Sequence, residues 1–340
     1  MALVLCDDPP AARTWFGVPA ARAAPCPLTG LEPALRAAAP AVFDRGPCPV
    51  YGRPEPPPPF RLEVPSWRPP PRFRILLLAA RAGRSNLDVL TGLLRRSVPL
   101  PEGLVCAAVR GRGFLGRFDR TWRALEGNLH AVVHLAPRVE LGRAGAAFTA
   151  MAAVAAAEAA ARLAPGVPPP EIKWVNDLFL EGRKVGGVLT RQSCQASLIT
   201  NVLLGIGVNL RADPRLPPDP FVPATGCLAE LRPGGTWSPA AFLRALLERI
   251  EHWYTRLLRR GPAALLEAYR RHAGFIGRRV RVFEDRYGFE EGGVAGRRLL
   301  ARGRVKGVAD DLSLLVEGCP GPVRSGRMAY EEDCPSGGEP

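Results

Sequence analysis

The chain has 340 residues, of which 47% are hydrophobic, enough for a buried core with one large domain and one or two small ones. Thr149, Glu158 and Arg162 interrupt the alanine-rich stretch 144–163, so no apolar run of about 18 residues suggests a membrane span. The formal net charge of +14 is spread along the chain, which favours an acidic partner or a polyphosphate over sequence-independent nucleic-acid binding.

The cysteines and the N-terminus bear on the compartment. The eight cysteines show neither a CxxC pair nor metal-ligand spacing, which predicts scattered reduced thiols. The N-terminus lacks the apolar core of a secretory signal, and Asp7 and Asp8 are unusual in an acid-poor transit peptide. We therefore expect a cytoplasmic protein, with an atypical organellar address left open.

Residues 1–72 are rich in proline and alanine. Prolines dominate 54–59 and recur at 69–71, which favours extended or irregular backbone. This composition predicts a poorly defined, linker-like extension. The segment shows no pair of short amphipathic helices joined by a glycine turn, so no helix-turn-helix DNA reader is expected.

At residue 73 the proline-rich stretch ends and apolar, periodic segments begin. A buried strand is expected over 74–80, and an apolar-periodic run over 87–94 predicts a helix capped by Ser85 or Asn86. Capping alone would explain these two polar residues.

A second strand is expected over 104–109, and it leads into Arg110-Gly-Arg-Gly-Phe-Leu-Gly-Arg117. Glycines let the backbone of such a loop approach a ligand closely, while guanidinium groups neutralise anionic oxygens. Solvated basic loops are nevertheless common, and this one lacks the Gly-Lys-Ser/Thr of a Walker loop. Residues 128–134 then return to the sheet, with structural rather than catalytic histidines.

A helix is expected over 145–163, followed by a strand over 171–175 and a bend at Asn176-Asp177. Residues 178–180 and 185–190 then form a hairpin across Glu181-Gly182.

Two of the three lysines of the chain, Lys173 and Lys184, lie in this region, whereas the chain has 43 arginines. In such a chain a lysine indicates a place where a compact ammonium is needed and a planar guanidinium does not fit, although chance placement is the simpler alternative.

The remaining elements complete the predicted domains. A long buried strand over 197–210 contains Gly205 and Gly207, and two amphipathic helices follow at 239–259 and 261–272. Short strands from residue 275 onward predict a small β-barrel of about 55 residues. The predicted domains are a catalytic domain at 73–272, a C-terminal domain at 273–332 and a disordered tail at 333–340.

Five motifs in register resemble the biotin protein ligases over roughly residues 73 to 330. In chain order they are Gly111-Arg-Gly-Phe-Leu-Gly-Arg117, Lys173-Trp-Val-Asn-Asp177, Gly182-Arg-Lys-Val-Gly-Gly187, Gly205-Ile-Gly-Val-Asn209 and Ala224-Thr-Gly-Cys-Leu228. The resemblance implies an α+β fold with a mixed sheet and helices on one side, related to the lipoate ligases, followed by a small SH3-like barrel.

The same resemblance implies a two-step reaction. Biotin and ATP form biotinyl-AMP and pyrophosphate, and a lysine of a biotin carboxyl carrier domain of a biotin-dependent carboxylase then attacks the acyl-adenylate. Mg²⁺ is the implied metal, and a homodimer is left open. Both steps pass through crowded anionic centres, so positioning and charge stabilisation carry the catalysis.

The implied roles fall on particular residues. Lys184, Arg112 and Arg117 are the implied catalytic residues, with Lys184 bridging the biotin carboxylate and the α-phosphate. The implied biotin-binding residues are Ser85, Asn86, Arg112, Gly113, Phe114, Lys184 and Gly187. Those implied for ATP are Arg117, Trp122, Asn176, Lys184 and Asn209, and Asp177 is the implied metal ligand.

This chain departs from the family pattern at several positions. Phe114 and Leu115 replace an arginine or small residue, and the glutamine usual before the loop is missing. Val175 replaces a proline, Arg84-Ser85-Asn86 replaces Ser-Thr-Asn, and residues 118–120 are inserted.

Two other classes of protein are also considered, a ligase for a different acid and a non-catalytic protein. An octanoyl or lipoyl protein ligase shares the same fold. A non-catalytic, biotin-responsive regulatory protein that binds nucleic acid would need a DNA-binding domain, and a degenerate ligase would have lost its lysine. Residues 1–72 show no such domain, and Lys184 is present.

Overall fold

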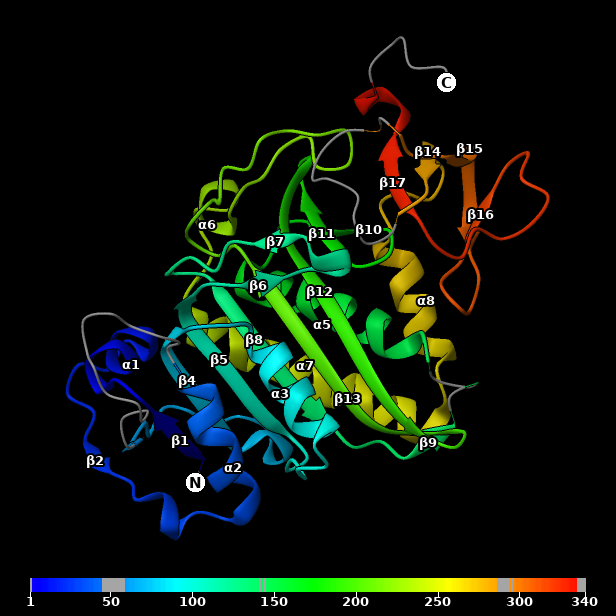
Figure 1. The fold of residues 1–340 in the computed structure, drawn as a ribbon. Helices are drawn as coiled ribbons and strands as arrows, with labels where there is room; N and C mark the ends of the chain where they lie inside the picture. The colour runs from blue at the N-terminus through cyan, green and yellow to red at the C-terminus, as the bar shows by residue number, and fades with distance from the viewer. Residues whose placement is uncertain are drawn as a thin grey trace.

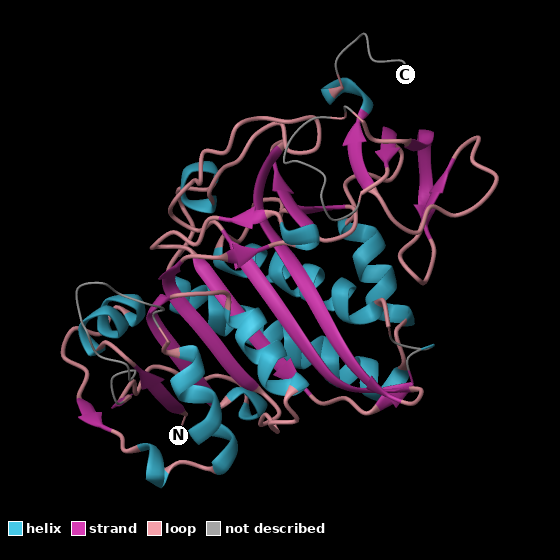
Figure 2. Cartoon of the chain, in the orientation of Figure 1, coloured by secondary structure: helices cyan, strands magenta, loops and turns pink. Residues whose placement is uncertain are grey.

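The computed structural model describes residues 2–44, 59–140, 142, 145–285, 294 and 296–334. Within these residues, one large mixed sheet carries helices on both faces, and a smaller sheet lies near the C-terminus (Figures 1 and 2). The large sheet is eleven-stranded, with the order β10-β11-β12-β13-β8-β5-β4-β1-β3-β2 and with β9 paired to β13.

Its central strands are parallel at two junctions, β1 with β4 and β4 with β5, and the other pairings are antiparallel. Its strands are β1 (Leu3–Cys6), β2 (Ala23–Pro25), β3 (Phe60–Leu62), β4 (Ile75–Ala82), β5 (Leu104–Gly111), β8 (Leu129–Leu135), β9 (Val139–Glu140), β10 (Glu171–Lys173), β11 (Asp177–Leu180), β12 (Arg183–Gln195) and β13 (Leu198–Val208).

Helices pack on the two faces according to the alternation of the strands. In β4, Leu76 and Leu78 join the core beneath α1, α5, α7 and α8, whereas Leu77 and Ala79 join the core beneath α2 and α3. The expectation of helices on one side therefore needs correction, because α2 and α3 occupy the second face. The helices are α1 (Pro9–Phe16), α2 (Pro33–Val42), α3 (Asn86–Arg95), α5 (Ala147–Leu163), α6 (Leu228–Leu231), α7 (Pro239–Arg260) and α8 (Ala263–His272).

Local sequence explains where the long helices lie. In α5 the alanines let the helix backbone pack closely on the sheet, and most residues between Ala147 and Ala160 are buried. Helix α7 begins where the Ser238 hydroxyl accepts a hydrogen bond from Ala241 N at 3.1 Å, with Pro239 in its first turn. Both helices match the expected ranges within two residues.

The N-terminal segment differs from the expected linker-like extension. Strands β1, β3 and β2 extend the large sheet beyond β4, and the Asp7 carboxylate accepts a hydrogen bond from Ala80 N at 2.7 Å. Trp15 and Phe43 are buried. The proline-rich composition obscured these short strands, because their stability comes from pairing with β4, which is distant in sequence. Residues 45–58, including most of the proline run, lie outside the described residues.

The hairpin expected across Glu181-Gly182 is present. Strands β11 and β12 pair in antiparallel register, and Glu181 and Gly182 have φ values of 51° and 73°. Two successive residues with positive φ are typical of the turn that suits a tight hairpin. Consequently Asp177 lies opposite Gly187, which brings the two ends of the predicted site segment together.

The smaller sheet has four strands in the order β16-β15-β14-β17. Its members are β14 (Arg279–Phe283), β15 (Leu299–Val308), β16 (Leu314–Val316) and β17 (Arg327–Tyr330). Of the expected tail, Asp333 ends a 3-10 turn and Cys334 is buried, so these two residues differ from the expected disorder. Residues 335–340 lie outside the described residues.

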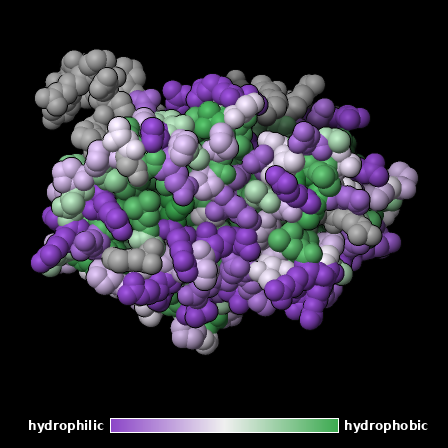
Figure 3. Space-filling model, turned by 90° about the horizontal axis from the view of Figure 1, so that it is seen from below, coloured by the Kyte–Doolittle hydropathy of each residue, from purple (hydrophilic) through white to green (hydrophobic). Residues whose placement is uncertain are grey.

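The surface seen from below is dominated by polar side chains, with apolar patches between them (Figure 3). Among the helices that the structure describes, none combines the length and apolar character needed to cross a membrane.

Candidate functional site

A cavity of about 440 Å³ lies where the large sheet meets β17 of the smaller sheet. The start of α3, the glycine–arginine loop, strands β8 and β10 to β13, and residues 214–225 supply its other walls. The loop contains two short paired strands, β6 (Phe114–Leu115) and β7 (Thr121–Trp122). The predicted site residues that line the cavity are Ser85, Asn86, Phe114, Arg117, Trp122, Asn176, Asp177, Lys184, Gly187 and Asn209.

One end of the cavity carries an unsatisfied amide. Asn86 is 1% exposed, and neither its Oδ1 nor its Nδ2 has a hydrogen-bond partner in the described structure. Ser85 is the cap of α3, because its hydroxyl accepts a hydrogen bond from Leu87 N at 3.2 Å. A buried polar pair without partners costs free energy unless a ligand satisfies it. The Asn86 amide therefore offers one donor and one acceptor that no described protein group uses.

The floor of the cavity depends on two glycines of β13. A Cβ at Gly207 would lie 2.5 Å from the Trp122 ring, and a Cβ at Gly205 would lie 3.1 Å from Leu87. The indole therefore packs directly on the backbone of the sheet. This contact explains why the strand has glycine at these two positions.

His130 anchors the Trp122 indole through a hydrogen bond. Trp122 Nε1 donates to His130 Nδ1 at 3.2 Å, and His130 Nε2 lies 2.9 Å from Leu125 O. This pattern requires a neutral imidazole that donates from Nε2. Burial lowers the pKa of His130 to about 4, so the ring stays neutral near pH 7. The expectation of a structural histidine fits this arrangement.

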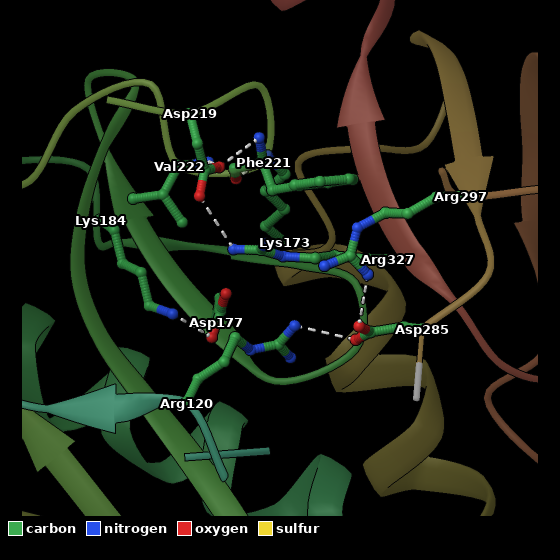
Figure 4. A network of polar contacts seen from close by, with 10 residues as sticks. All are labelled: Arg120, Lys173, Asp177, Lys184, Asp219, Phe221, Val222, Asp285, Arg297 and Arg327. Atoms are coloured by element: carbon green, nitrogen blue, oxygen red, sulfur yellow. Dashed lines mark hydrogen bonds and ion pairs between the residues drawn. The ribbon is translucent and has the colours of Figure 1, made fainter. Parts of the chain in front are cut away.

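The other end of the cavity carries a lysine–carboxylate pair. Lys184 Nζ lies 2.8 Å from Asp177 Oδ1 (Figure 4). A Cβ at Gly187 would lie 3.1 Å from the same oxygen and 3.8 Å from Lys184 Cε, so the glycine leaves room for the pair. Burial raises the pKa of the Asp177 carboxyl, but Lys184, with Arg120 and Lys173, outweighs burial and holds that pKa below its usual range. Asp177 is therefore an anion held among cations.

Lys173 has a different environment from Lys184. It is 2% exposed, its Nζ donates to Phe221 O at 2.7 Å, and it lies over the rings of Phe179 and Tyr330. Burial lowers its pKa to about 8. Because Tyr330 belongs to β17, Lys173 links the end of β10 to the smaller sheet. Its charge also stabilises the ionised Asp177 carboxylate.

The two asparagines of the motifs are both anchored by their amide nitrogens. Asn176 Nδ2 donates to Val188 O at 2.5 Å, and Asn209 Nδ2 donates to Gly226 O at 3.1 Å. Asn209 Oδ1 is buried without a partner in the described structure. Since the Nδ2 contact fixes the orientation of the amide, Asn209 presents an acceptor for a ligand donor.

The glycine–arginine loop divides its predicted residues. Arg117 and Phe114 line the cavity, but Arg112 and Gly113 are exposed and lie outside its lining. The division has a local cause, since the Phe114 ring packs on Gly111, where a Cβ would lie 2.3 Å from it. That contact turns Phe114 inward and leaves the two preceding residues at the surface.

Arg120 and Arg327 are among the cavity residues that the sequence did not single out. Arg120 Nη1 lies 2.9 Å from Asp285 Oδ2, in the segment after β14, although Arg120 belongs to the three inserted residues (Figure 4). Arg327 Nη2 lies 3.3 Å from Asp219 Oδ2, and Arg327 Nη1 is buried without a described partner. With 43 arginines in the chain, composition could not single them out; the inserted position of Arg120 was the only signal.

The described residues contain no group of three or more His, Cys, Asp or Glu side chains that could hold a metal ion by itself. Asp219 is engaged by Phe221 N, Val222 N and Arg327. Asp177 is therefore the carboxylate that faces the cation-rich end of the cavity, and a metal there would need further ligands from a substrate.

Comparison with known proteins identifies a family whose match covers most of the site segments described above. The family model for the biotin/lipoate A/B protein ligase family matches residues 88–209. Among solved structures, a biotin protein ligase from Aquifex aeolicus in complex with biotin and ATP superposes with a TM-score of 0.58 at 21% identity, covering 76% of this chain and 98% of that one. At this identity the similarity establishes the fold.

Curated relatives include the bifunctional ligase/repressor BirA of Bacillus subtilis, 32% identical over 120 residues. That match covers 35% of this chain and only 36% of the relative. The biotin–(acetyl-CoA-carboxylase) ligase of Paracoccus denitrificans is 31% identical over 172 residues, covering 48% of this chain and 67% of the relative. Because that match spans two thirds of the relative, and the family model includes Asp177, Lys184 and Asn209, the chain belongs to the biotin protein ligase family.

Proposed function

We propose that this protein activates biotin with ATP as biotinyl-AMP and transfers the biotinyl group to a lysine of a biotin carboxyl carrier domain. One observation carries the proposal. A single cavity joins a buried, unsatisfied amide at Asn86 to a cluster of cations that includes Lys184, Arg117 and Arg120. A ligand with a neutral hydrogen-bonding head and an anionic tail suits such a cavity.

The head of biotin is a cyclic urea, which has N–H donors and a carbonyl acceptor. Asn86 offers both complementary atoms, and Leu87, Val132 and Leu189 supply apolar wall around it. An octanoyl or lipoyl chain would leave the Asn86 amide unsatisfied, at a cost of about 1–3 kcal/mol. The cavity therefore supports biotin over these two acids.

In the first step a carboxylate oxygen of biotin attacks the α-phosphorus of ATP and pyrophosphate leaves. Lys184 is placed to contact the carboxylate and the α-phosphate, since a compact ammonium can follow negative charge between neighbouring oxygens. Arg117 and Arg120 stabilise the charge that develops on the phosphate oxygens. Arg327, whose Nη1 has no partner among the described residues, adds a further donor at this end.

The adenine ring is proposed to pack beside Trp122, whose indole already covers Gly207. Asn209 Oδ1, which is buried without a described partner, would accept a hydrogen bond from the exocyclic amino group of adenine. This pairing would discriminate against a base that presents an acceptor at the same edge.

Mg²⁺ fits the donor chemistry of Asp177, because this hard cation is commonly held by one or two carboxylates together with substrate phosphates and water. Asp177, with Asn176 beside it, would hold the ion. Bound there, Mg²⁺ would supply positive charge to the phosphates. Lys184 and Asp177 would remain close enough to orient the reacting groups.

Further parts of the proposal concern the whole molecule. The smaller sheet is proposed to be an SH3-like barrel. The chain is proposed to comprise a catalytic domain at 73–272, whose sheet is extended by the strands of the N-terminal segment, and a C-terminal domain at 273–332. A cytoplasmic location and a homodimer are also proposed, and cell fractionation and sedimentation velocity would test them.

The direct test is a labelling reaction. Purified protein, ATP, Mg²⁺ and labelled biotin are expected to label a carboxyl carrier domain, and Lys184→Ala is expected to abolish the label. Parallel reactions with octanoate and lipoate decide the acid. Preferential transfer of either would show that the protein is a different ligase on this fold, and binding of biotin without turnover would indicate a regulatory protein.

A further inference from the structure

The N-terminal segment, residues 2–44, contacts the chain just before the Asn86 end of the cavity. Strand β1 runs beside the first half of β4 (Figure 1) and ends where Cys6 lies opposite Leu78. Strand β4 continues beyond this pairing, and the turn 83–85 then leads into α3. Because α3 begins with Asn86, contacts that fix the end of β4 also fix the amide that faces the cavity.

The Asp7 side chain continues the pairing where β1 ends. Asp7 is 5% exposed, and its Oδ1 accepts a hydrogen bond from Ala80 N at 2.7 Å. Ala80 is two residues beyond Leu78, so the carboxylate occupies the place that a further backbone carbonyl of β1 would have. A backbone N–H shielded from water costs free energy without an acceptor, so this contact stabilises the last residues of β4.

A second contact holds the turn itself. Gly83 N donates to Asp44 O at 3.2 Å, just beyond the end of α2. Helix α2 also packs beside α3, since Leu35 and Val42 of α2 belong to the same buried cluster as Leu87 of α3. The N-terminal segment therefore contacts the end of β4, the turn that follows it and the side of α3.

None of the described residues of this segment lines the cavity, whose lining on this side is Ser85, Asn86 and Leu87. A contribution of the segment to ligand binding must therefore act through the position of these three residues. Asn86 is the most sensitive of them, because both polar atoms of its amide are buried without a described partner. They must meet the atoms of a ligand at hydrogen-bonding distance and angle.

We propose that the N-terminal segment is a positioning element for the biotin-binding end of the site, with Asp7 as its principal contact. The proposed function supplies biotin as the ligand of Asn86, and the inference rests on it in that respect. Asp7 holds the end of β4 so that the first turn of α3 presents the Asn86 amide to the cyclic urea. Asp7 is thus a positioning residue.

The consequence is selective for one of the two substrates. The pairing of β11 with β12 sets the positions of Asp177 and Lys184, and β13, β8 and β5 separate these strands from β4. A shift at the end of β4 should therefore weaken biotin binding while ATP binding is retained. A segment that only stabilised the fold would change both affinities or neither.

The test removes the Asp7 acceptor and then restores it. Asp7→Leu has a similar size without an acceptor, whereas Asp7→Asn keeps an Oδ1 that can accept from Ala80 N. Titration of the purified full-length protein with biotin should give a Kd about tenfold or more weaker in Asp7→Leu, because the Asn86 amide is displaced from its ligand atoms. Asp7→Asn should stay within about twofold of wild type, as should the Kd for ATP in both variants.

Asp8→Ala is the matched control for stability alone. Asp8 caps α1, since its Oδ1 accepts from Ala11 N at 3.1 Å. Loss of the cap should lower the midpoint of urea denaturation and leave the Kd for biotin within about twofold of wild type. Equal weakening of biotin binding in Asp8→Ala and Asp7→Leu would overturn the proposal, because the segment would then act through stability alone. A wild-type Kd for biotin in Asp7→Leu would also overturn it.

A measurement on wild-type protein decides the matter should Asp7→Leu fold poorly. If docking of the segment strengthens biotin binding, biotin must strengthen docking of the segment by the same factor. Saturating biotin should therefore slow hydrogen exchange of the β1 amides by about tenfold, and ATP at the same occupancy should not. Unchanged β1 exchange at saturating biotin would contradict the positioning role, whereas failure of wild-type protein to bind biotin at all would contradict the proposed function itself.

Discussion

Two segments of the molecule bring charge to the same cavity by different means. In the segment 171–190, paired strands fix each side chain, since Lys173 lies opposite Asp177 and Asp177 lies opposite Gly187. In the glycine–arginine loop, the strands β6 and β7 have only two residues each, and Phe118 and Asp119 have positive φ values. Sheet register therefore determines the first segment, whereas contacts with distant residues determine the second.

The loop contacts come from the C-terminal part of the chain. Arg120 pairs with Asp285, whose side chain is 2% exposed, and Arg297 lies 3.0 Å from the other oxygen of the same carboxylate. Gly116 N donates to Arg120 O, which links this pair to the turn that carries Arg117. The position of Arg117 thus depends on residues about 165 positions away in sequence.

The largest effect is expected from Lys184→Ala in the strand-paired segment. Because the ammonium contacts charge that moves during adenylate formation, its loss should slow biotin-dependent ATP–pyrophosphate exchange by about 10³-fold. Lys306→Ala, which removes an exposed lysine of β15, is the matched control. Equal exchange rates in the two variants would remove Lys184 from catalysis.

The second effect tests whether the loop depends on the smaller sheet. Asp285→Ala removes a buried carboxylate shared by two arginines, so the free energy of unfolding should fall by about 3 kcal/mol. Urea denaturation measures the loss, and limited proteolysis should show earlier cleavage within residues 111–123. Arg120→Gln should give a smaller loss, and the double variant should be less destabilised than the sum of the two. Strict additivity would mean that the two groups do not interact.

The third prediction compares the rate of adenylate formation in variants of two arginines of the glycine–arginine loop. Arg117→Gln should slow adenylate formation by about 10²-fold, because Arg117 lines the cavity. Arg112→Gln should change the rate by no more than about twofold, because the exposed side chain lies outside that lining. Pre-steady-state measurement of pyrophosphate release compares them. A large loss in Arg112→Gln would indicate that the loop closes differently around substrates.

The smallest effect concerns Lys173 and pH. Burial lowers its pKa to about 8 from the ordinary 10.5, so between these values the unfolded chain binds more protons than the folded protein. The free energy of unfolding contributed by Lys173 should therefore rise with pH across this window, by at most about 1.4 kcal/mol per pH unit. The difference between wild type and Lys173→Met in urea denaturation at pH 8 to 10 isolates this contribution. A flat difference would show that Lys173 does not titrate in this range.

The sequence by itself determined the elements with strong local patterns. The hairpin at Glu181-Gly182, the Ser85 cap and the long helices α5 and α7 follow from turn chemistry, capping and periodicity, which involve residues close in sequence. The scarcity of lysine pointed to Lys184, and glycines in β13 pointed to a close contact on that strand.

Only the tertiary structure decided how distant residues meet. It joined the proline-rich N-terminal segment to β4, turned Arg112 outward and Arg117 inward, and brought Arg120 and Arg327 to the cavity. The physical reason is that strand pairing at a sheet edge, and ion pairs between segments far apart in sequence, leave no periodic pattern in either partner. The sequence specified which residues could perform the chemistry, and packing between distant segments selected those that surround the cavity.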